Sequence, residues 1–165
     1  MQDRPGALRR IATAGLIVVL TLAMAVGLFA ATMAVWVPDV KAGFDPRRSI
    51  TETLSATIAS GGVDGAIKQY HALKAAQPTT YNFDETELNT LGYRLIRAKK
   101  FKDAVRVFQL NIEAYPQSSN AYDSLGEAYM DDGDKPQAIA NYRKSVQLNP
   151  KNRNAIVYLQ KLNAP

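Results

Sequence analysis

The sequence of 165 residues contains no cysteine and a single histidine, His71. The lack of cysteine excludes disulfides, thiolate zinc ligands and a thiol nucleophile, and one histidine cannot supply a metal site that needs two imidazoles. The motifs Ser-x-x-Lys and Gly-x-Ser-x-Gly are missing, as are the glycine-rich loops that bind phosphate. We therefore expect a protein without catalytic residues, cofactor or metal, and not an enzyme.

Two local patterns resemble functional sites, one a catalytic base and the other a calcium-binding loop, but both have simpler explanations. His71 follows the apolar Tyr70 on a predicted helix, so we expect an exposed side chain rather than a catalytic base. The aspartates of the segment 131–134 resemble the start of a calcium loop. Position twelve of such a loop would be Tyr142, however, which cannot act as the bidentate carboxylate ligand.

Positive charge exceeds negative charge only moderately, with 20 Lys and Arg against 15 Asp and Glu. The densest basic stretch consists of Arg94, Arg97, Lys99, Lys100, Lys102 and Arg106. We interpret it as a solvated turn between two helices, and contact with anionic lipid or an acidic partner stays an alternative. It lacks the interleaved aromatic residues of a nucleic-acid platform, so no nucleic-acid partner is expected.

Hydrophobic residues are concentrated in Ile11–Val37, a segment that is mostly hydrophobic and contains no charged residue. A helix of this length measures roughly 40 Å, more than the roughly 30 Å of bilayer hydrocarbon. The sequence predicts one transmembrane helix over residues 11–37, a signal anchor between a basic N-terminus (1–10) and a linker (38–47). The alternative is a cleaved signal peptide, whose apolar core is usually only about 7–15 residues long.

The flanks of this segment predict its orientation. Three arginines precede it, whereas the first charged residues after it sum to slightly negative. The positive-inside rule then leaves the N-terminus in the cytoplasm and places the remainder outside it, in the periplasm if the protein is bacterial. Small residues recur every four positions at Ala23, Gly27 and Ala31, a pattern that lets membrane helices pair, so a weak homo-oligomer is an open alternative.

The C-terminal part of the chain repeats itself at a fixed spacing. Seven positions match between the copies: Leu88, Leu91, Gly92, Leu95, Ala104, Phe108 and Pro116 in the first, and Tyr122, Leu125, Gly126, Tyr129, Ala138, Tyr142 and Pro150 in the second. Each copy predicts a helix whose glycine allows close packing, followed by a helix with an alanine and an aromatic residue four positions apart. Apart from the prolines, we expect these residues to form the repeat core.

This pattern resembles the tetratricopeptide repeat, a helix–turn–helix unit whose length equals the spacing between the two copies. The resemblance implies an all-α solenoid of about two to three repeats with a cap helix. It divides the chain into a degenerate helix pair (48–81), a first repeat (85–118), a second repeat (119–150) and a C-terminal cap helix (152–163).

In tetratricopeptide proteins the first helix of each repeat lines a groove. Carried over to this sequence, the groove positions are Thr86, Asn89, Tyr93, Ile96, Arg97, Asn120, Asp123, Glu127, Met130 and Asp131. The second half of this set is acidic, so the resemblance implies an extended peptide with basic and apolar side chains. The cationic clamp that some members use for a C-terminal carboxylate is missing, because Asn89 and Tyr93 stand in place of its first Lys and Asn.

These patterns predict a membrane-anchored, extracytoplasmic module for protein–protein interaction and scaffolding in the cell envelope. A narrower resemblance offers an alternative. The segments 81–85 and 87–93 are similar to the repeat tail of bacterial secreted serine hydrolases related to β-lactamases, which implies an accessory subunit or detached tail for a separate hydrolase. A structural membrane protein that associates with itself is the third alternative.

Overall fold

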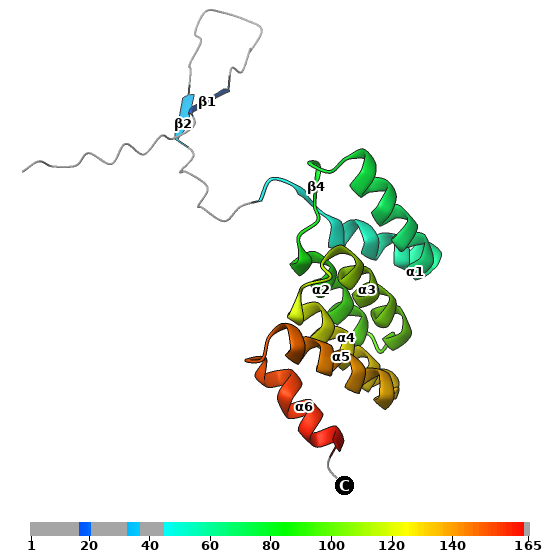
Figure 1. Cartoon of the computed structure of the whole chain (residues 1–165). Helices are drawn as coiled ribbons and strands as arrows, with labels where there is room; N and C mark the ends of the chain where they lie inside the picture. The colour runs from blue at the N-terminus through cyan, green and yellow to red at the C-terminus, as the bar shows by residue number, and fades with distance from the viewer. Residues whose placement is uncertain (1–16, 21–32, 37–44, 164–165) are drawn as a thin grey trace, which may run out of the picture. The chain divides into compact units, whose positions relative to one another are not determined.

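The computed structural model describes residues 17–20, 33–36 and 45–163 (Figure 1). The chain divides into two compact units, Met1–Asp45 and Pro46–Pro165. Each unit is described by itself.

In the first unit, two short strands lie within the segment for which the sequence predicts a transmembrane helix. Strands β1 (Ile17–Leu20) and β2 (Met33–Trp36) pair antiparallel, with Ile17 opposite Trp36 and Leu20 opposite Met33. At these positions the structure has paired strands where the sequence predicts a helix, because β-branched and aromatic residues favour a strand and the pairing satisfies the backbone groups on the facing edges. The rest of residues 11–37, residues 1–10 and the linker up to residue 44 lie outside the described residues. Among the described helices, none is both long and apolar enough to cross a bilayer.

The described part of the second unit consists of six helices and one small strand pair. The helices are α1 (Ile50–Ala76), α2 (Glu85–Arg97), α3 (Phe101–Ala114), α4 (Ser119–Asp132), α5 (Lys135–Leu148) and α6 (Arg153–Asn163). Strands β3 (Arg48–Ser49) and β4 (Tyr81–Asn82) pair in parallel and join the two ends of α1. This unit has the all-α solenoid fold that the sequence predicts (Figure 1).

Helix α1 is a helix pair rather than one continuous rod. Gly62 interrupts it with a φ of 78°, a left-handed conformation that glycine adopts without steric cost. The chain then folds back, so that the Thr57 hydroxyl donates a hydrogen bond to Gln69 Oε1 over 2.5 Å. The two halves, residues 50–61 and 63–76, occupy the segment for which the sequence predicts a degenerate repeat.

The two clear repeats are held together by glycine–aromatic contacts. A Cβ on Gly126 would lie 2.8 Å from ring atoms of Tyr142, and a Cβ on Gly92 would overlap the ring of Phe108. These glycines therefore allow α4 to approach α5, and α2 to approach α3, closely enough for both rings to be fully buried.

The residues of the predicted repeat core are buried, with two exceptions. Tyr122 and Tyr129 are each only partly buried. The Tyr129 ring packs against the core while its hydroxyl accepts a hydrogen bond from the exposed Gln109. The Lys144 ammonium group lies over the ring of Tyr122, 6.0 Å from the centroid of that ring. The amphipathic tyrosine side chain explains both deviations, because its polar end stays near water.

Candidate functional site

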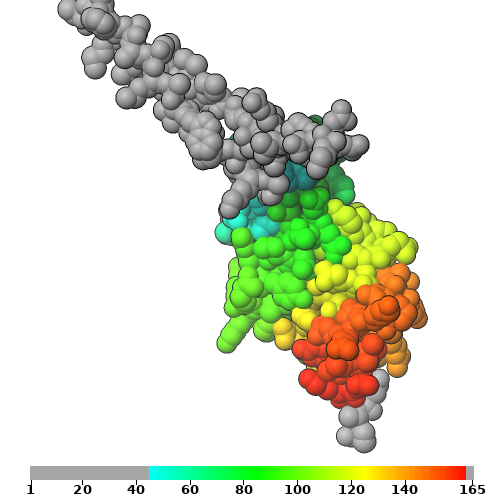
Figure 2. Space-filling model, turned by 90° about the vertical axis from the view of Figure 1, so that its left-hand side faces the viewer, coloured from blue at the N-terminus to red at the C-terminus, as the bar shows by residue number. Residues whose placement is uncertain are grey.

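Helices α2, α4 and α6 form one face of the solenoid, which we call the first-helix face. Helix α4 packs against α2 and against α6. In the space-filling view, the colours run from green through yellow and orange to red, with part of α5 also visible between α4 and α6 (Figure 2). The face therefore brings together side chains that lie about one repeat length apart in the sequence.

Polar side chains of α2 and α4 are connected across this face. The Tyr93 hydroxyl donates a hydrogen bond to Glu127 Oε2 over 2.8 Å and lies 3.2 Å from Ser124 Oγ. Ser124 in turn donates to Asn89 Oδ1 over 2.8 Å. Burial raises the pKa of Tyr93, and the negative charge of Glu127 adds to this, so the hydroxyl stays protonated as a donor.

A single amide connects α6 to two carboxylates of α4. Asn154 Nδ2 donates hydrogen bonds of 2.7 Å to both Asp123 Oδ2 and Glu127 Oε1. Asp123 is only 8% exposed, and its other oxygen, Oδ1, is buried without a hydrogen-bond partner among the described residues. Burial raises the pKa of Asp123, and the amide of Asn154 opposes this while the charge of Glu127 adds to it.

A cavity of about 160 Å³ lies beside these carboxylates, lined by Glu127, Met130, Asp131, Tyr142 and Tyr158. The rings of Tyr142 and Tyr158 are stacked, with centroids 5.1 Å apart and planes inclined by 4°. Tyr142 is fully buried, and its hydroxyl has no hydrogen-bond partner in the part of the chain that the structure describes. We call this cavity the α4–α6 pocket.

The structure unites some of the predicted groove residues and separates others. Asn89, Tyr93, Asp123 and Glu127 belong to the hydrogen-bonded set, and Met130 and Asp131 line the α4–α6 pocket. Four predicted positions take no part in either: Ile96 packs against the hydrophobic core, Asn120 donates to Glu85 Oε1 over 2.9 Å, and Thr86 and Arg97 are exposed.

Four residues of this site are not among the predicted groove positions: Ser124, Asn154 and Tyr158, and Tyr142, which the sequence predicts only as a repeat-core residue. Asn154 could have been found, because it follows the groove position Asn120 by one full repeat length. Continuing the repeat spacing into the cap helix leads directly to it. Ser124 and Tyr158 carry no such signal, since neither follows a groove position at this spacing.

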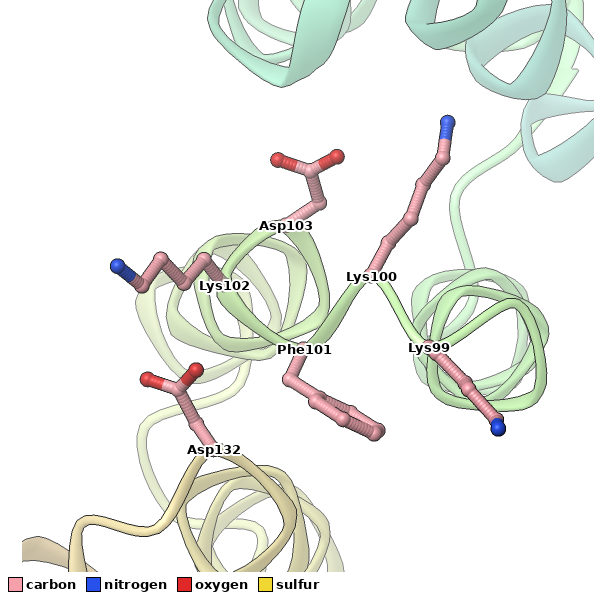
Figure 3. Close-up of a pocket in the computed structure, with 6 residues that line it drawn as sticks. All are labelled: Lys99, Lys100, Phe101, Lys102, Asp103 and Asp132. Atoms are coloured by element: carbon pink, nitrogen blue, oxygen red, sulfur yellow. The ribbon is translucent and has the colours of Figure 1, made fainter.

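The basic stretch 94–106 has a largely structural environment. Arg94 forms an ion pair with Glu52 over 2.7 Å and Arg106 with Asp64 over 2.8 Å, so both contact α1. A cavity of about 380 Å³ is lined by Lys99, Lys100, Phe101, Lys102, Asp103 and Asp132 (Figure 3). The three ammonium groups point in different directions in this view and do not converge on one anion (Figure 3).

The remaining candidate groups show no arrangement for chemistry. His71 is exposed, and its Nε2 lies 3.8 Å from Glu113 Oε1. Within residues 17–20, 33–36 and 45–163, no cluster of three His, Asp or Glu residues is placed to hold a metal ion.

Part of this chain is similar to a known protein family. The tetratricopeptide repeat family matches residues 119–152. No curated protein matches the sequence. Neither the predicted membrane anchor nor the resemblance to serine hydrolase tails is addressed by these results.

Solved structures to which the chain is similar include the second TPR domain of human RPAP3 in complex with the HSP70 peptide SGPTIEEVD. It is 18% identical, with a TM-score of 0.50 over 71% of this chain and 94% of that one. The first TPR domain of human RPAP3 is 23% identical, with a TM-score of 0.48 over 68% and 86% of the two chains. MamA from Desulfovibrio magneticus RS-1 is 23% identical, with a TM-score of 0.47 over 69% and 62%. The chain thus contains a tetratricopeptide repeat at residues 119–152 and has the fold of tetratricopeptide-repeat proteins.

Proposed function

We propose that this protein is an interaction module that binds an extended peptide segment of a partner protein on the first-helix face. We further propose that residues 11–37 anchor it in a membrane with residues 45–163 outside the cytoplasm. The observation that carries the first part is the hydrogen-bonded set that joins α2, α4 and α6 through Tyr93, Glu127 and Asn154.

This set fixes the side chains of the face before any partner binds. Tyr93 and Asn154 hold the two oxygens of the Glu127 carboxylate from opposite sides, over 2.8 and 2.7 Å. A face whose side chains are already ordered loses little conformational entropy on binding, which favours affinity. The activity that we propose for this face is therefore reversible binding of a partner.

The charge of the face favours a basic segment as the partner. Asp123, Glu127 and Asp131 follow one another at intervals of four residues on α4, so they lie on one side of that helix. Among the described residues, none of the three forms an ion pair with Lys, Arg or His. Opposite charge on the partner would complement Glu127 and Asp131 of this row, since Asp123 is only 8% exposed, and would fix the partner's register.

The membrane anchor is supported by the sequence, in which the uncharged segment Ile11–Val37 follows an arginine-rich N-terminus. A reporter enzyme fused behind Pro165 tests it. We expect activity only from a reporter that works outside the cytoplasm. Activity confined to the cytoplasmic reporter would contradict the proposed location.

Crosslinking in intact cells followed by mass spectrometry tests the proposed interaction. Wild type is compared with Glu127→Lys, which reverses a charge on the face, and with Glu113→Lys, which makes the same change at an exposed position on α3. We expect the main crosslinked partner to be lost from Glu127→Lys and retained by Glu113→Lys. The same partners at the same yields in all three would show that the first-helix face is not the binding surface.

A further inference from the structure

We propose that the α4–α6 pocket receives one basic side chain, lysine or arginine, of the bound peptide. This inference rests on the proposed function and deepens it, because it names the residue that determines which peptide binds. The pocket is formed by Glu127, Met130 and Asp131 from α4, Tyr142 from α5 and Tyr158 from α6.

The size of the pocket fits a side chain rather than a whole small molecule. Its volume is about 160 Å³, whereas pockets for drug-sized ligands usually measure about 300–1,000 Å³. One of its lining residues, Glu127, also accepts the hydrogen bonds of Tyr93 and Asn154 on the first-helix face. A peptide lying along this face would therefore reach the pocket with one side chain.

The pocket lining is apolar in part and negatively charged in part. The partly exposed Tyr158 and Met130 offer apolar surface, with the buried ring of Tyr142 stacked behind Tyr158, and the carboxylates of Glu127 and Asp131 offer negative charge. Lysine and arginine have the same division, since their methylene stems pack on apolar surface while their charged ends seek polar partners. Acidic side chains are disfavoured by the two carboxylates.

The Tyr142 hydroxyl is a buried polar group without a hydrogen-bond partner among the described residues, on a residue that lines the pocket. Tyr142 is fully buried, and buried hydroxyls are nearly always paired. Burial raises the pKa of this hydroxyl, as does the nearby charge of Glu127, so it remains protonated. An ammonium or guanidinium group that enters the pocket and displaces the atoms covering this oxygen would donate a hydrogen bond to it, which an aliphatic guest cannot do.

Among the described residues, no basic side chain of this chain forms an ion pair with the carboxylates of the pocket. Asn154, a neutral amide, supplies the hydrogen bonds to Asp123 and Glu127. The basic group beside Tyr158, Lys161 of α6, has its ammonium 5.3 Å from the centroid of that ring and forms no ion pair with the acids of α4 among the described residues. In this proposal, the positive charge that balances Glu127 and Asp131 therefore comes from the bound peptide.

The test uses four pools of synthetic decapeptides in which one central position is fixed as Lys, Arg, norleucine or Glu. The flanking positions are random mixtures of Ala, Ser, Thr, Gln and Leu. The full chain, kept in solution with a mild zwitterionic detergent, is immobilised, and the retained fraction of each pool is measured. We expect wild type to retain the Lys and Arg pools about tenfold more than the norleucine and Glu pools.

Adjacent residues provide a matched pair of variants. Asp131→Asn and Asp132→Asn remove the same charge from α4, but only Asp131 lines the α4–α6 pocket. We expect Asp131→Asn to lower retention of the Lys pool about tenfold and Asp132→Asn to leave it within about twofold. Tyr142→Phe removes the unpaired hydroxyl and should lower retention by about three- to tenfold without lowering the melting temperature.

The outcomes separate this inference from the proposed function. The Lys pool could be strongly retained while Asp131→Asn and Asp132→Asn change its retention equally and Tyr142→Phe does not change it. That result would overturn the proposed role of the pocket and leave peptide binding intact. Equal retention of the norleucine and Lys pools would also overturn the pocket. Failure of wild type to retain any pool would overturn the proposed function together with the pocket.

Discussion

The hydroxyl of Tyr93 donates a hydrogen bond to Glu127 Oε2 over 2.8 Å, and the two residues lie 34 positions apart. They therefore occupy the same position in two successive repeats, one on α2 and one on α4. The repeat that generates the fold thus also generates the candidate site, because equivalent positions of neighbouring repeats meet on the first-helix face.

Replacing Tyr93 by phenylalanine should destabilise the protein. The change removes a hydrogen bond to a carboxylate at a partly buried position, and we expect the free energy of unfolding to fall by about 1–2 kcal/mol. Urea unfolding measures the effect. Tyr129→Phe is the control, because among the described residues that hydroxyl has one hydrogen bond, from the exposed Gln109, and we expect it to cost less than about 0.5 kcal/mol. Equal losses in both variants would contradict the role assigned to the Tyr93–Glu127 bond.

Asn154→Ala should loosen α6 from α4. The change leaves Asp123 and Glu127 without the amide that donates to both of them, at a cost of about 1–3 kcal/mol. Amide hydrogen exchange should then become faster across Arg153–Asn163 than in α2. The matched control is Gln160→Ala, at an exposed position of the same helix. Similar exchange in both variants would show that Asn154 does not hold α6 in place.

Alanine at Gly126 or Gly92 should destabilise the repeats, because its Cβ would collide with the ring of Tyr142 or Phe108. Such overpacking usually costs about 1–3 kcal/mol. Gly61→Ala is expected to have the opposite sign, with a gain of about 0.4–1 kcal/mol, since nothing lies within 4 Å of its Cβ position. Thermal melting compares the three variants. A melting temperature for Gly126→Ala at or above that of wild type would refute the proposed role of the close contact.

The raised pKa of Asp123 predicts how stability depends on pH. The folded protein keeps this proton at pH values where the unfolded chain, with a pKa of about 3.9, has lost it. The folded state then binds more protons, so the contribution of Asp123 to stability falls as the pH rises above about 4. Asp123→Asn lacks this contribution, so its stability relative to wild type should increase between about pH 4 and pH 7.

Chemical denaturation at a series of pH values measures that difference. The exposed Asp132→Asn variant controls for the loss of one negative charge from α4. The free energy of unfolding of Asp123→Asn minus that of wild type should increase over this range. A constant or decreasing difference would contradict a pKa of Asp123 that burial raises.

The repeat core could be predicted because its spacing is a direct consequence of packing. Gly92 and Phe108 recur as Gly126 and Tyr142, and each pair is in contact in the structure. Tyr122 and Tyr129 follow the same spacing but are only partly buried, since the pattern of residue types does not reveal where a hydroxyl finds its partner.

The candidate site could be predicted only in part. The acidic character of α4 is visible in the sequence, whereas the amide of Asn154 and the unpaired hydroxyl of Tyr142 become meaningful only when α4, α5 and α6 are packed together. The groove position Asn120 is predicted to face a partner, but it contacts Glu85 instead, because both lie near the beginning of their helices.

The N-terminal strands show the limit of reasoning from hydropathy. The apolar run Ile11–Val37 is long enough to span a bilayer as a helix, but length and hydropathy do not exclude strand formation by its β-branched residues. The pairing of Ile17–Leu20 with Met33–Trp36 is a structural feature that the hydropathy of the segment does not predict.

Hydrogen exchange of the full chain with and without the Lys-centred decapeptide pool tests the central claim most directly. We predict slower exchange in α2, α4 and α6, strongest in the part of α4 that carries Glu127 and Asp131, with little change in α3. Slower exchange confined to α3 and α5, or none at a saturating concentration of the pool, would contradict peptide binding on the first-helix face.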